Sequence, residues 1–280
     1  MRCTAYILVA DPNFLAESLR SYYHRVERIV LSYDRTATSW TGTPLPVDQC
    51  LQVVAELDVD GKCVHAPGDY ARLNHDPLVN DTHQRQEALD LASCGADWVL
   101  QLDTDEVMLE PDTFFAALRR ADAVGASGLD YPSRWLYSRV APGRYLEATR
   151  RFWGVAASFP GPLAVRAGTT LQQARQADVP LYRVDLKAWN TDPAHRHDSV
   201  VHEVISPEAA VLHFSWVRDH DTMRRKFGWS GHAAEYSKPV VYQRWAARQQ
   251  HPCRAVLTSP FRSSDWFRLV SVPEPPGGEP

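Results

Sequence analysis

The chain has 280 residues, with 30 lysines and arginines against 34 aspartates and glutamates, so its formal net charge is −4. A chain of this length can bury a substantial core as one large domain. The slight acidic excess excludes a general electrostatic attraction to nucleic acid or to anionic lipid, so any polyanionic ligand must be held by a local site.

The five cysteines are scattered and include no Cys-x-x-Cys pair, which indicates reduced thiols. The first apolar run, residues 5–10, is too short for the hydrophobic region of a signal peptide and is closed by Asp11 and Pro12. No segment approaches the roughly 20 apolar residues of a transmembrane helix. We therefore expect a cytoplasmic protein without a transmembrane segment.

Residues 1–125 alternate short apolar runs with amphipathic stretches, which is typical of β/α units around a mainly parallel sheet. Asp81 is the expected N-cap of the third helix, and Gly95 is expected to terminate it. Another helix is expected after Pro111. The predicted strands are residues 4–9, 28–33, 62–66 and 98–102. The predicted helices are residues 14–23, 47–57, 82–93 and 114–120.

After Gly125 the pattern changes to segments rich in Trp, Tyr and Arg, with many Gly and Pro breaks. Residues 126–270 are therefore predicted to form an irregular, acceptor-side half of the same domain. Its clearest strand is residues 209–216, and its clearest helix is residues 219–236. Residues 271–280 are low in apolar content and are predicted to be a disordered tail.

The most informative feature is an apolar strand that runs into three acidic side chains within four residues. Residues 98–102 have the pattern of a buried strand, and Asp103 and Asp105 would project to one side of the chain that leaves it. Hard divalent cations prefer such carboxylates and commonly bind substrate phosphates as well. A solvated acidic turn is the alternative, but the position behind a buried strand favours a metal site.

Polar residues follow each of the four predicted strands, at the edge where α/β sheets bind their ligands. Ala10 and Asp11 follow the first strand, Asp34 the second, residues 67–69 the third and residues 103–105 the fourth. Asp and Gly are also the ordinary residues of loops. Their coincidence at one edge predicts a single site.

These features resemble the family 2 glycosyltransferases of the GT-A fold. The similarity covers residues 4–110 and, in patches, residues 195–235, while residues 126–194 match nothing. The acidic Asp-Thr-Asp-Glu run and two later motifs are more similar to the lipopolysaccharide core β-glucosyltransferase branch. The matching residues are Asp11, Asp34, the helix at 81–92 with Arg85 and Gln86, the run 95–106, Val201-His202-Glu203 and His213-Phe214-Ser215.

The resemblance implies a Rossmann-like, mainly parallel central sheet flanked by helices, a nucleotide-diphosphate sugar donor, and inversion at the anomeric carbon. It also implies Mn²⁺ or Mg²⁺ on the donor diphosphate. Asp34 is implied to contact the base or ribose. The residues implied to bind the donor are Ala10, Asp11, Asp34, Arg85, Asp103 and Thr104, and those implied to bind the metal are Asp103, Asp105 and His213.

An inverting transfer requires a base that takes the proton from the acceptor hydroxyl. Glu203 is the preferred candidate because residues 200–202 form a short apolar stretch that can place its carboxylate at a partly desolvated strand end, and because it matches the family. Asp198 is the competing candidate. A surface glutamate without a chemical role is a further alternative.

Two other side chains have two interpretations each. Arg85 can donate hydrogen bonds to diphosphate oxygens, or it can pair with Glu87 or Asp81 as an ordinary helix cation. His213 can complete the metal or diphosphate site, or it can be a core histidine on an apolar strand. No zinc-binding pattern accompanies the histidines.

The predicted helix at 219–236 contains several cations that can close over phosphates, although a cationic face packed on the domain is the alternative. Large aromatic side chains can stack on sugar rings, although most are core residues. The cations and the tryptophan of the helix are Arg224, Arg225, Lys226 and Trp229, and the stacking candidates are Trp135, Tyr137, Trp153 and Trp189.

The predicted function is a metal-dependent inverting glycosyltransferase that moves a sugar from a UDP- or GDP-sugar to a hydroxyl acceptor by single displacement. The acceptor is a saccharide, a glycolipid or a small molecule. One alternative is a sugar nucleotidyltransferase, although residues 11–13 lack the Gly-rich, basic phosphate loop of such enzymes. The other is a non-catalytic nucleotide- or carbohydrate-binding module. No nucleic-acid partner is expected, and a homodimer is left open.

Overall fold

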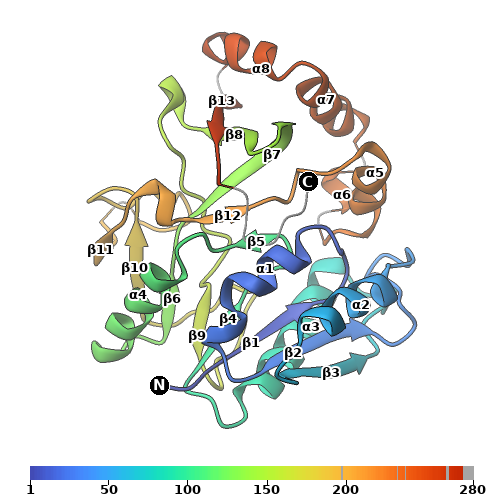
Figure 1. The fold of residues 1–280 in the computed structure, drawn as a ribbon, viewed down its shortest axis with the longest axis vertical. Helices are drawn as coiled ribbons and strands as arrows, with labels where there is room; N and C mark the ends of the chain where they lie inside the picture. Colours follow the sequence, from blue (N-terminus) through green and yellow to red (C-terminus); the bar gives the residue numbers. More distant parts are fainter. Residues whose placement is uncertain (197, 232, 237, 263–264, 274–280) are drawn as a thin grey trace.

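The computed structural model describes residues 1–273 except 197, 232, 237, 263 and 264. These residues form a mixed α/β fold, in which a large, mainly parallel sheet is flanked by helices and a second sheet lies beside it (Figure 1). The predicted α/β class and the Rossmann-like character of the central sheet are therefore confirmed.

The central sheet has the strand order β11-β10-β6-β9-β4-β1-β2-β3, and only β9 runs antiparallel to its neighbours within the described residues. Four of its strands come from the second half of the chain, so the sheet continues across residue 125. The strands are β1 (Cys3–Leu8), β2 (Ile29–Asp34), β3 (Cys63–Gly68), β4 (Trp98–Gln101), β6 (Gly128–Asp130), β9 (Ala164–Arg166), β10 (Leu181–Asp185) and β11 (Glu203–Val204).

The second sheet brings the end of the chain against the acidic run. It has the order β13-β8-β7-β12-β5, and His213 in β12 is paired with Glu106 in β5 on one side and with Trp135 in β7 on the other. The strands are β5 (Glu106–Val107), β7 (Ser133–Ala141), β8 (Arg144–Thr149), β12 (Val211–His213) and β13 (Trp266–Ser271).

Helices cover both faces of the central sheet and one end of the second sheet (Figure 1). None of the helices in the described residues is long and apolar enough to cross a bilayer. The helices are α1 (Leu15–Tyr22), α2 (Val47–Leu57), α3 (Pro77–Ser93), α4 (Pro111–Ala123), α5 (His220–Trp229), α6 (Ala233–Tyr236), α7 (Pro239–Gln250) and α8 (Pro252–Thr258). Short 3₁₀ helices lie at Tyr23–Arg25, Arg151–Trp153, Pro207–Ala209 and Ser259–Phe261.

Alternation along β1 explains why helices pack on both faces of the sheet. Ala5 and Ile7 belong to a buried cluster with side chains of α1, α2 and α4. Tyr6 and Leu8 point the other way and belong to a cluster with side chains of α3. Because both faces are covered, the strand is apolar throughout, as expected for a buried parallel strand. This packing fixes the carboxyl ends of β1, β2 and β4 at one edge.

The third helix begins earlier than predicted. Pro77 occupies its first turn, and the side chain of Asp76 accepts a hydrogen bond from the backbone N–H of Leu78 at 2.8 Å. Asp76 is therefore the N-cap, and the assignment of Asp81 to this position is wrong. Asp81 lies buried inside the helix. Gly95, with φ of 75°, follows the end of the helix as predicted.

The predicted helix at 219–236 is divided into α5 and α6. The side chain of Asp219 caps α5 by accepting hydrogen bonds from the backbone N–H groups of Asp221, at 2.9 Å, and Thr222, at 2.8 Å. Ser230 then adopts an extended backbone, with φ of −62° and ψ of 149°, which ends α5. The break places Ser230 and Gly231 beside the residues that end β1, β2 and β4.

Two other predicted boundaries are corrected. The strand predicted at 209–216 is limited to β12, because Ala209 belongs to a 3₁₀ helix. The tail predicted at 271–280 begins too early, because Ser271 is paired with β8 as the last residue of β13. Residues 274–280 of that prediction lie outside the described residues.

Candidate functional site

A cavity of about 440 Å³ opens at the carboxyl ends of β1, β2 and β4. The loops after these strands form one wall, and α3, β12 and the α5–α6 segment contribute the others. We call it the central cavity. The predicted donor and metal residues all line it, namely Ala10, Asp11, Asp34, Arg85, Asp103, Thr104, Asp105 and His213.

Asp105 is surrounded by basic side chains from β12, α5 and the segment between them. Its Oδ2 accepts hydrogen bonds from Arg218 Nη2 at 2.8 Å and from Lys226 Nζ at 2.7 Å, and its Oδ1 lies 3.2 Å from His213 Nε2. Burial acts to raise the pKa of Asp105, but the charges of Lys226, His213 and Arg218 outweigh it, so the pKa lies well below its usual range. Asp105 is therefore a fixed anion.

Arg218 joins this cluster to the loop after β1. Its side chain is fully buried, and its Nε donates to Asp11 Oδ2 at 2.8 Å while Nη2 donates to Asp105. Its Nη1 donates to the carbonyl oxygens of Phe214 and Val217 at 2.7 and 2.8 Å. One guanidinium thus holds two buried carboxylates from segments far apart in the sequence.

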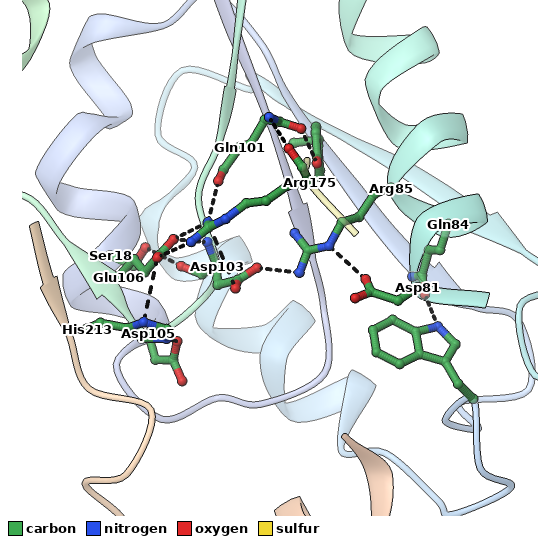
Figure 2. A network of polar contacts seen from close by, with 12 residues as sticks. Ser18, Asp81, Gln84, Arg85, Gln101, Asp103, Asp105, Glu106, Arg175 and His213 are labelled. Carbon is green, nitrogen blue, oxygen red and sulfur yellow. Dashed lines mark hydrogen bonds and ion pairs between the residues drawn. The ribbon is translucent and has the colours of Figure 1, made fainter. Parts of the chain in front are cut away.

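Arg85 bridges a second pair of carboxylates, and one of them is Asp81, the partner expected of an ordinary helix cation (Figure 2). Its Nε donates to Asp81 Oδ1 at 2.7 Å, and its Nη2 donates to Asp103 Oδ1 at 2.9 Å. Its Nη1 is buried and has no hydrogen-bond partner among the described residues. Burial acts to lower the pKa of Arg85, but the charges of Asp103 and Asp81 raise it by more, so the guanidinium stays protonated.

Glu106 positions Asp103 (Figure 2). Its carboxylate is fully buried and pairs with Arg175 through two hydrogen bonds of 2.6 and 2.5 Å, and Glu106 Oε2 also accepts the backbone N–H of Asp103 at 2.9 Å. Such a bidentate pair fixes both partners. Asp103 is consequently held with its side chain 30% exposed, the most accessible member of the acidic run.

The residues present fit a divalent cation. Asp103, Glu106 and His213 each offer a ligand atom, and these atoms lie within 4.8 Å of one another. His213 Nδ1 is buried without a hydrogen-bond partner in the described part of the chain, 3.8 Å from Glu106 Oε1. Carboxylates with one imidazole suit such an ion. Asp105, predicted as a ligand, is not part of this group, and its carboxylate pairs with Arg218 and Lys226.

Asp34 lines the central cavity, but both of its carboxylate oxygens accept hydrogen bonds from neighbouring loops. Its carboxylate accepts hydrogen bonds from Thr36 N and Oγ1, from Thr38 N, and from the N–H groups of Tyr70 and Ala71. A carboxylate has about four lone-pair sites, so these five donors saturate it. The predicted contact of Asp34 with the base or ribose therefore lacks a free acceptor.

The hydrogen bonds to Asp34 predict a specific pH dependence of stability. Burial acts to raise the pKa of Asp34, but the bonds from Thr36, Ala71 and Tyr70 outweigh it and hold the pKa below its usual value. A depressed pKa stabilises the fold above the unfolded-state value, and this contribution is lost as the pH falls below it. We expect Asp34→Asn to reduce the decline in free energy of unfolding below about pH 4, measured by urea titration. An identical decline in both proteins would contradict this assignment.

Glu203 and Asp198 do not line the central cavity. Glu203 lies in the edge strand β11, where its carboxylate pairs with Arg120 and accepts a hydrogen bond from the hydroxyl of Tyr182 at 3.3 Å. Asp198 is exposed and pairs with Arg196 at 2.9 Å. The sequence could not reveal this because the position of β11 depends on the strand order. Neither side chain is placed to deprotonate an acceptor in the cavity.

We therefore expect Glu203→Gln to keep turnover within about threefold of wild type, whereas loss of a true general base costs roughly 10²–10⁴-fold. Turnover is measured as metal-dependent release of nucleoside diphosphate from the donor. A loss above roughly 100-fold, with the circular dichroism spectrum unchanged, would restore the sequence-based assignment of Glu203 as the base.

One of the predicted stacking aromatics lines the central cavity. The ring centroid of Trp135 lies 5.2 Å from that of His213, and Trp135 Nε1 is buried without a partner among the described residues. Tyr137 instead stacks on Trp216 with centroids 5.2 Å apart, and Trp153 and Trp189 are exposed and lie away from the lining. Of these four aromatics, Trp135 is therefore the one placed to contact a ligand in the central cavity.

The α5–α6 segment covers one side of the central cavity. Lys226 and Trp229 line it, as do Ser230 and Gly231 at the break between the helices. Arg224 points to solvent, where it pairs with Asp221. Lys226 therefore contacts the acidic run, whereas Arg224 of the same helix points away from it.

The comparisons with known proteins show only distant likeness. No family model matches the sequence, and no curated protein matches it. A 4-diphosphocytidyl-2C-methyl-D-erythritol synthase from Anaerococcus prevotii is 12% identical, with 59% of this chain and 70% of that chain covered and a TM-score of 0.33. A CMP:2-keto-3-deoxy-manno-octonic acid synthetase complexed with CTP is 14% identical, with 48% and 53% covered and a TM-score of 0.32.

A mannose-1-phosphate geranyltransferase from Thermus thermophilus is 12% identical, with 61% of this chain and 51% of that chain covered and a TM-score of 0.30. The chain thus spans about half the length of this protein and of the CMP:2-keto-3-deoxy-manno-octonic acid synthetase. Similarity at this level assigns no activity, so the function is argued from the central cavity.

Proposed function

We propose that this protein is a metal-dependent glycosyltransferase of the GT-A type, which transfers a sugar from a UDP- or GDP-sugar to a hydroxyl acceptor. The observation that carries the proposal is the accessible carboxylate of Asp103 in a cavity of about 440 Å³, with Arg85 on one side and the unpartnered His213 Nδ1 on the other. A volume of this size suits a small organic ligand.

Each side chain then has a defined task. A Mn²⁺ or Mg²⁺ ion held by Asp103, Glu106 and His213 would offset the charge that develops on the departing diphosphate. Arg85, whose Nη1 has no hydrogen-bond partner among the described residues, would donate to the same oxygens. Trp135 supplies a flat surface for the sugar or base. The acceptor, whether saccharide, glycolipid or small molecule, approaches from the side formed by the second half of the chain.

A sugar nucleotidyltransferase is the second candidate, because an acidic cation site beside arginines also serves nucleotidyl transfer. The loop after β1 supports the glycosyltransferase instead. Its acidic residue, Asp11, is already bonded to Arg218, and the loop has no Gly-rich run of backbone donors for a triphosphate. The two activities differ in their leaving group and can be separated directly.

The test incubates the protein with UDP- and GDP-sugars, with and without Mn²⁺ or Mg²⁺, and measures release of nucleoside diphosphate. A parallel reaction contains sugar 1-phosphates with nucleoside triphosphates and measures pyrophosphate. Metal-dependent release of nucleoside diphosphate supports the proposal. Pyrophosphate release would identify a nucleotidyltransferase, and binding without either product would identify a binding module.

A further inference from the structure

A second hollow, remote in sequence from the acidic run, is lined by arginines. Arg244 and Arg248 of α7, His251 between the helices, Arg254 of α8 and Arg262 beyond it line a groove of about 200 Å³. We call it the arginine groove. The two helices that form it lie at one end of the molecule, on the outside of the second sheet (Figure 1).

The positive charge of this segment is almost uncompensated. Residues 238–262 contain five lysines or arginines and no aspartate or glutamate, in a chain whose net charge is −4. Arg248 pairs with Asp265 at 2.8 Å, but no carboxylate among the described residues pairs with Arg244, Arg254 or Arg262. The net charge of the whole chain therefore conceals a local cationic surface.

The arginines converge because the opposite faces of both helices are used for packing. Trp245 of α7 is buried, and its Nε1 donates to the carbonyl oxygen of Trp216 at 2.9 Å, while Ala255 of α8 is buried against β13 and β8. Burial lowers the pKa of Arg248, the charge of Asp265 opposes this, and the charges of Arg262 and Arg244 lower the pKa further. Mutual repulsion of this kind is relieved by an anionic ligand.

Two large apolar side chains stand beside the cations. Leu257 is 72% exposed and Phe261 is 90% exposed. Leu257 follows Arg254 by three residues within α8, which places the two on the same side of that helix, and Phe261 ends the following 3₁₀ helix, next to Arg262 in the chain. A free phosphate would use the arginines but gain nothing from these side chains. Basic residues next to exposed Phe and Leu are instead typical of a surface that lies on a lipid interface.

We propose that the arginine groove, with Leu257 and Phe261, docks this protein on the surface of an anionic phospholipid bilayer. The arginines pair with lipid phosphates, and the two apolar side chains enter the boundary between headgroups and acyl chains. This proposal does not depend on the activity of the central cavity.

The test is cosedimentation of the full chain with vesicles of phosphatidylcholine alone or with roughly 30% phosphatidylglycerol. We expect binding to the anionic vesicles only, weakened by salt. A variant with Arg244→Ala, Arg254→Ala and Arg262→Ala should bind roughly 100-fold more weakly, at about fivefold per arginine. Phe261→Ser should weaken binding at unchanged net charge.

The matched control removes three exposed arginines elsewhere, by Arg35→Ala, Arg119→Ala and Arg196→Ala, and should bind the vesicles as wild type does. Thermal unfolding followed by circular dichroism confirms that each variant is folded. The proposal is overturned if the wild type does not sediment with vesicles, or if it sediments equally with neutral and anionic vesicles. It is also overturned if both triple variants lose the same amount of vesicle binding. Release by inorganic phosphate beyond that caused by chloride of the same ionic strength overturns it as well, because the groove would then hold free phosphate.

Discussion

Replacing Arg218 with methionine is expected to lower the free energy of unfolding by about 3–5 kcal/mol, the usual cost of removing one partner from a buried ion pair. Arg218 is fully buried and is bonded to Asp11 and Asp105. Methionine fills much of the same space. The expected loss of stability therefore comes from the two carboxylates, which keep fewer hydrogen-bond partners, and not from a large cavity. The measurement is urea unfolding followed by fluorescence.

The control is Arg196→Met, because this arginine is 85% exposed and pairs with Asp198 on the surface. Exposed pairs contribute about 0–1 kcal/mol, so this variant should stay close to wild type. Adding Asp11→Asn to Arg218→Met should recover part of the loss, since one of the unpaired charges is removed. A cost below about 1 kcal/mol for Arg218→Met alone would show that the buried network does not hold the two segments together.

Asp103→Asn is expected to reduce turnover by on the order of 10²–10³-fold, the cost of losing one preorganised electrostatic contact in a reaction centre. The amide keeps the size of the side chain but cannot offer two anionic oxygens to a metal ion. Asp103 is also the member of the acidic run that is most exposed to the cavity. The measurement is release of nucleoside diphosphate from the donor across a range of Mn²⁺ concentrations.

Asp198→Asn makes the same chemical change at a carboxylate that does not line the central cavity and should retain wild-type turnover. Comparison of Asp103→Asn with Asp198→Asn therefore distinguishes a role of Asp103 in the central cavity from a general effect of removing a negative charge. Equal turnover of Asp103→Asn and wild type at saturating metal would remove Asp103 from the reaction centre.

The sequence predicted those parts of the fold and cavity that are encoded locally. The strands before Asp11, Asp34 and Asp103 are mainly apolar, and each runs into a polar residue, so the edge of the sheet could be located. The same reasoning failed for Asp81, because a proline one turn earlier starts the helix. The boundary of a helix depends on a single capping residue, whereas a strand is predicted from a run of several apolar residues.

The parts that could not be predicted depend on contacts between distant segments. Arg175 is 69 residues from its partner Glu106, and Arg218 is 207 residues from Asp11. Neither arginine lies in a recognisable motif, and the one available signal was a group of buried carboxylates that required cations. Glu203 lies outside the central cavity for a related reason, because its strand is at the far edge of the sheet.

The most direct test of the central claim is calorimetric titration of the wild type and the Asp103→Asn variant with UDP, GDP, TDP and CDP, each with and without Mn²⁺. The account predicts that the wild type binds UDP or GDP, that binding requires Mn²⁺, and that the variant loses it. Absence of binding for all four diphosphates, or binding that is unaffected by both the metal and the substitution, would contradict a metal-dependent donor site at the end of β4.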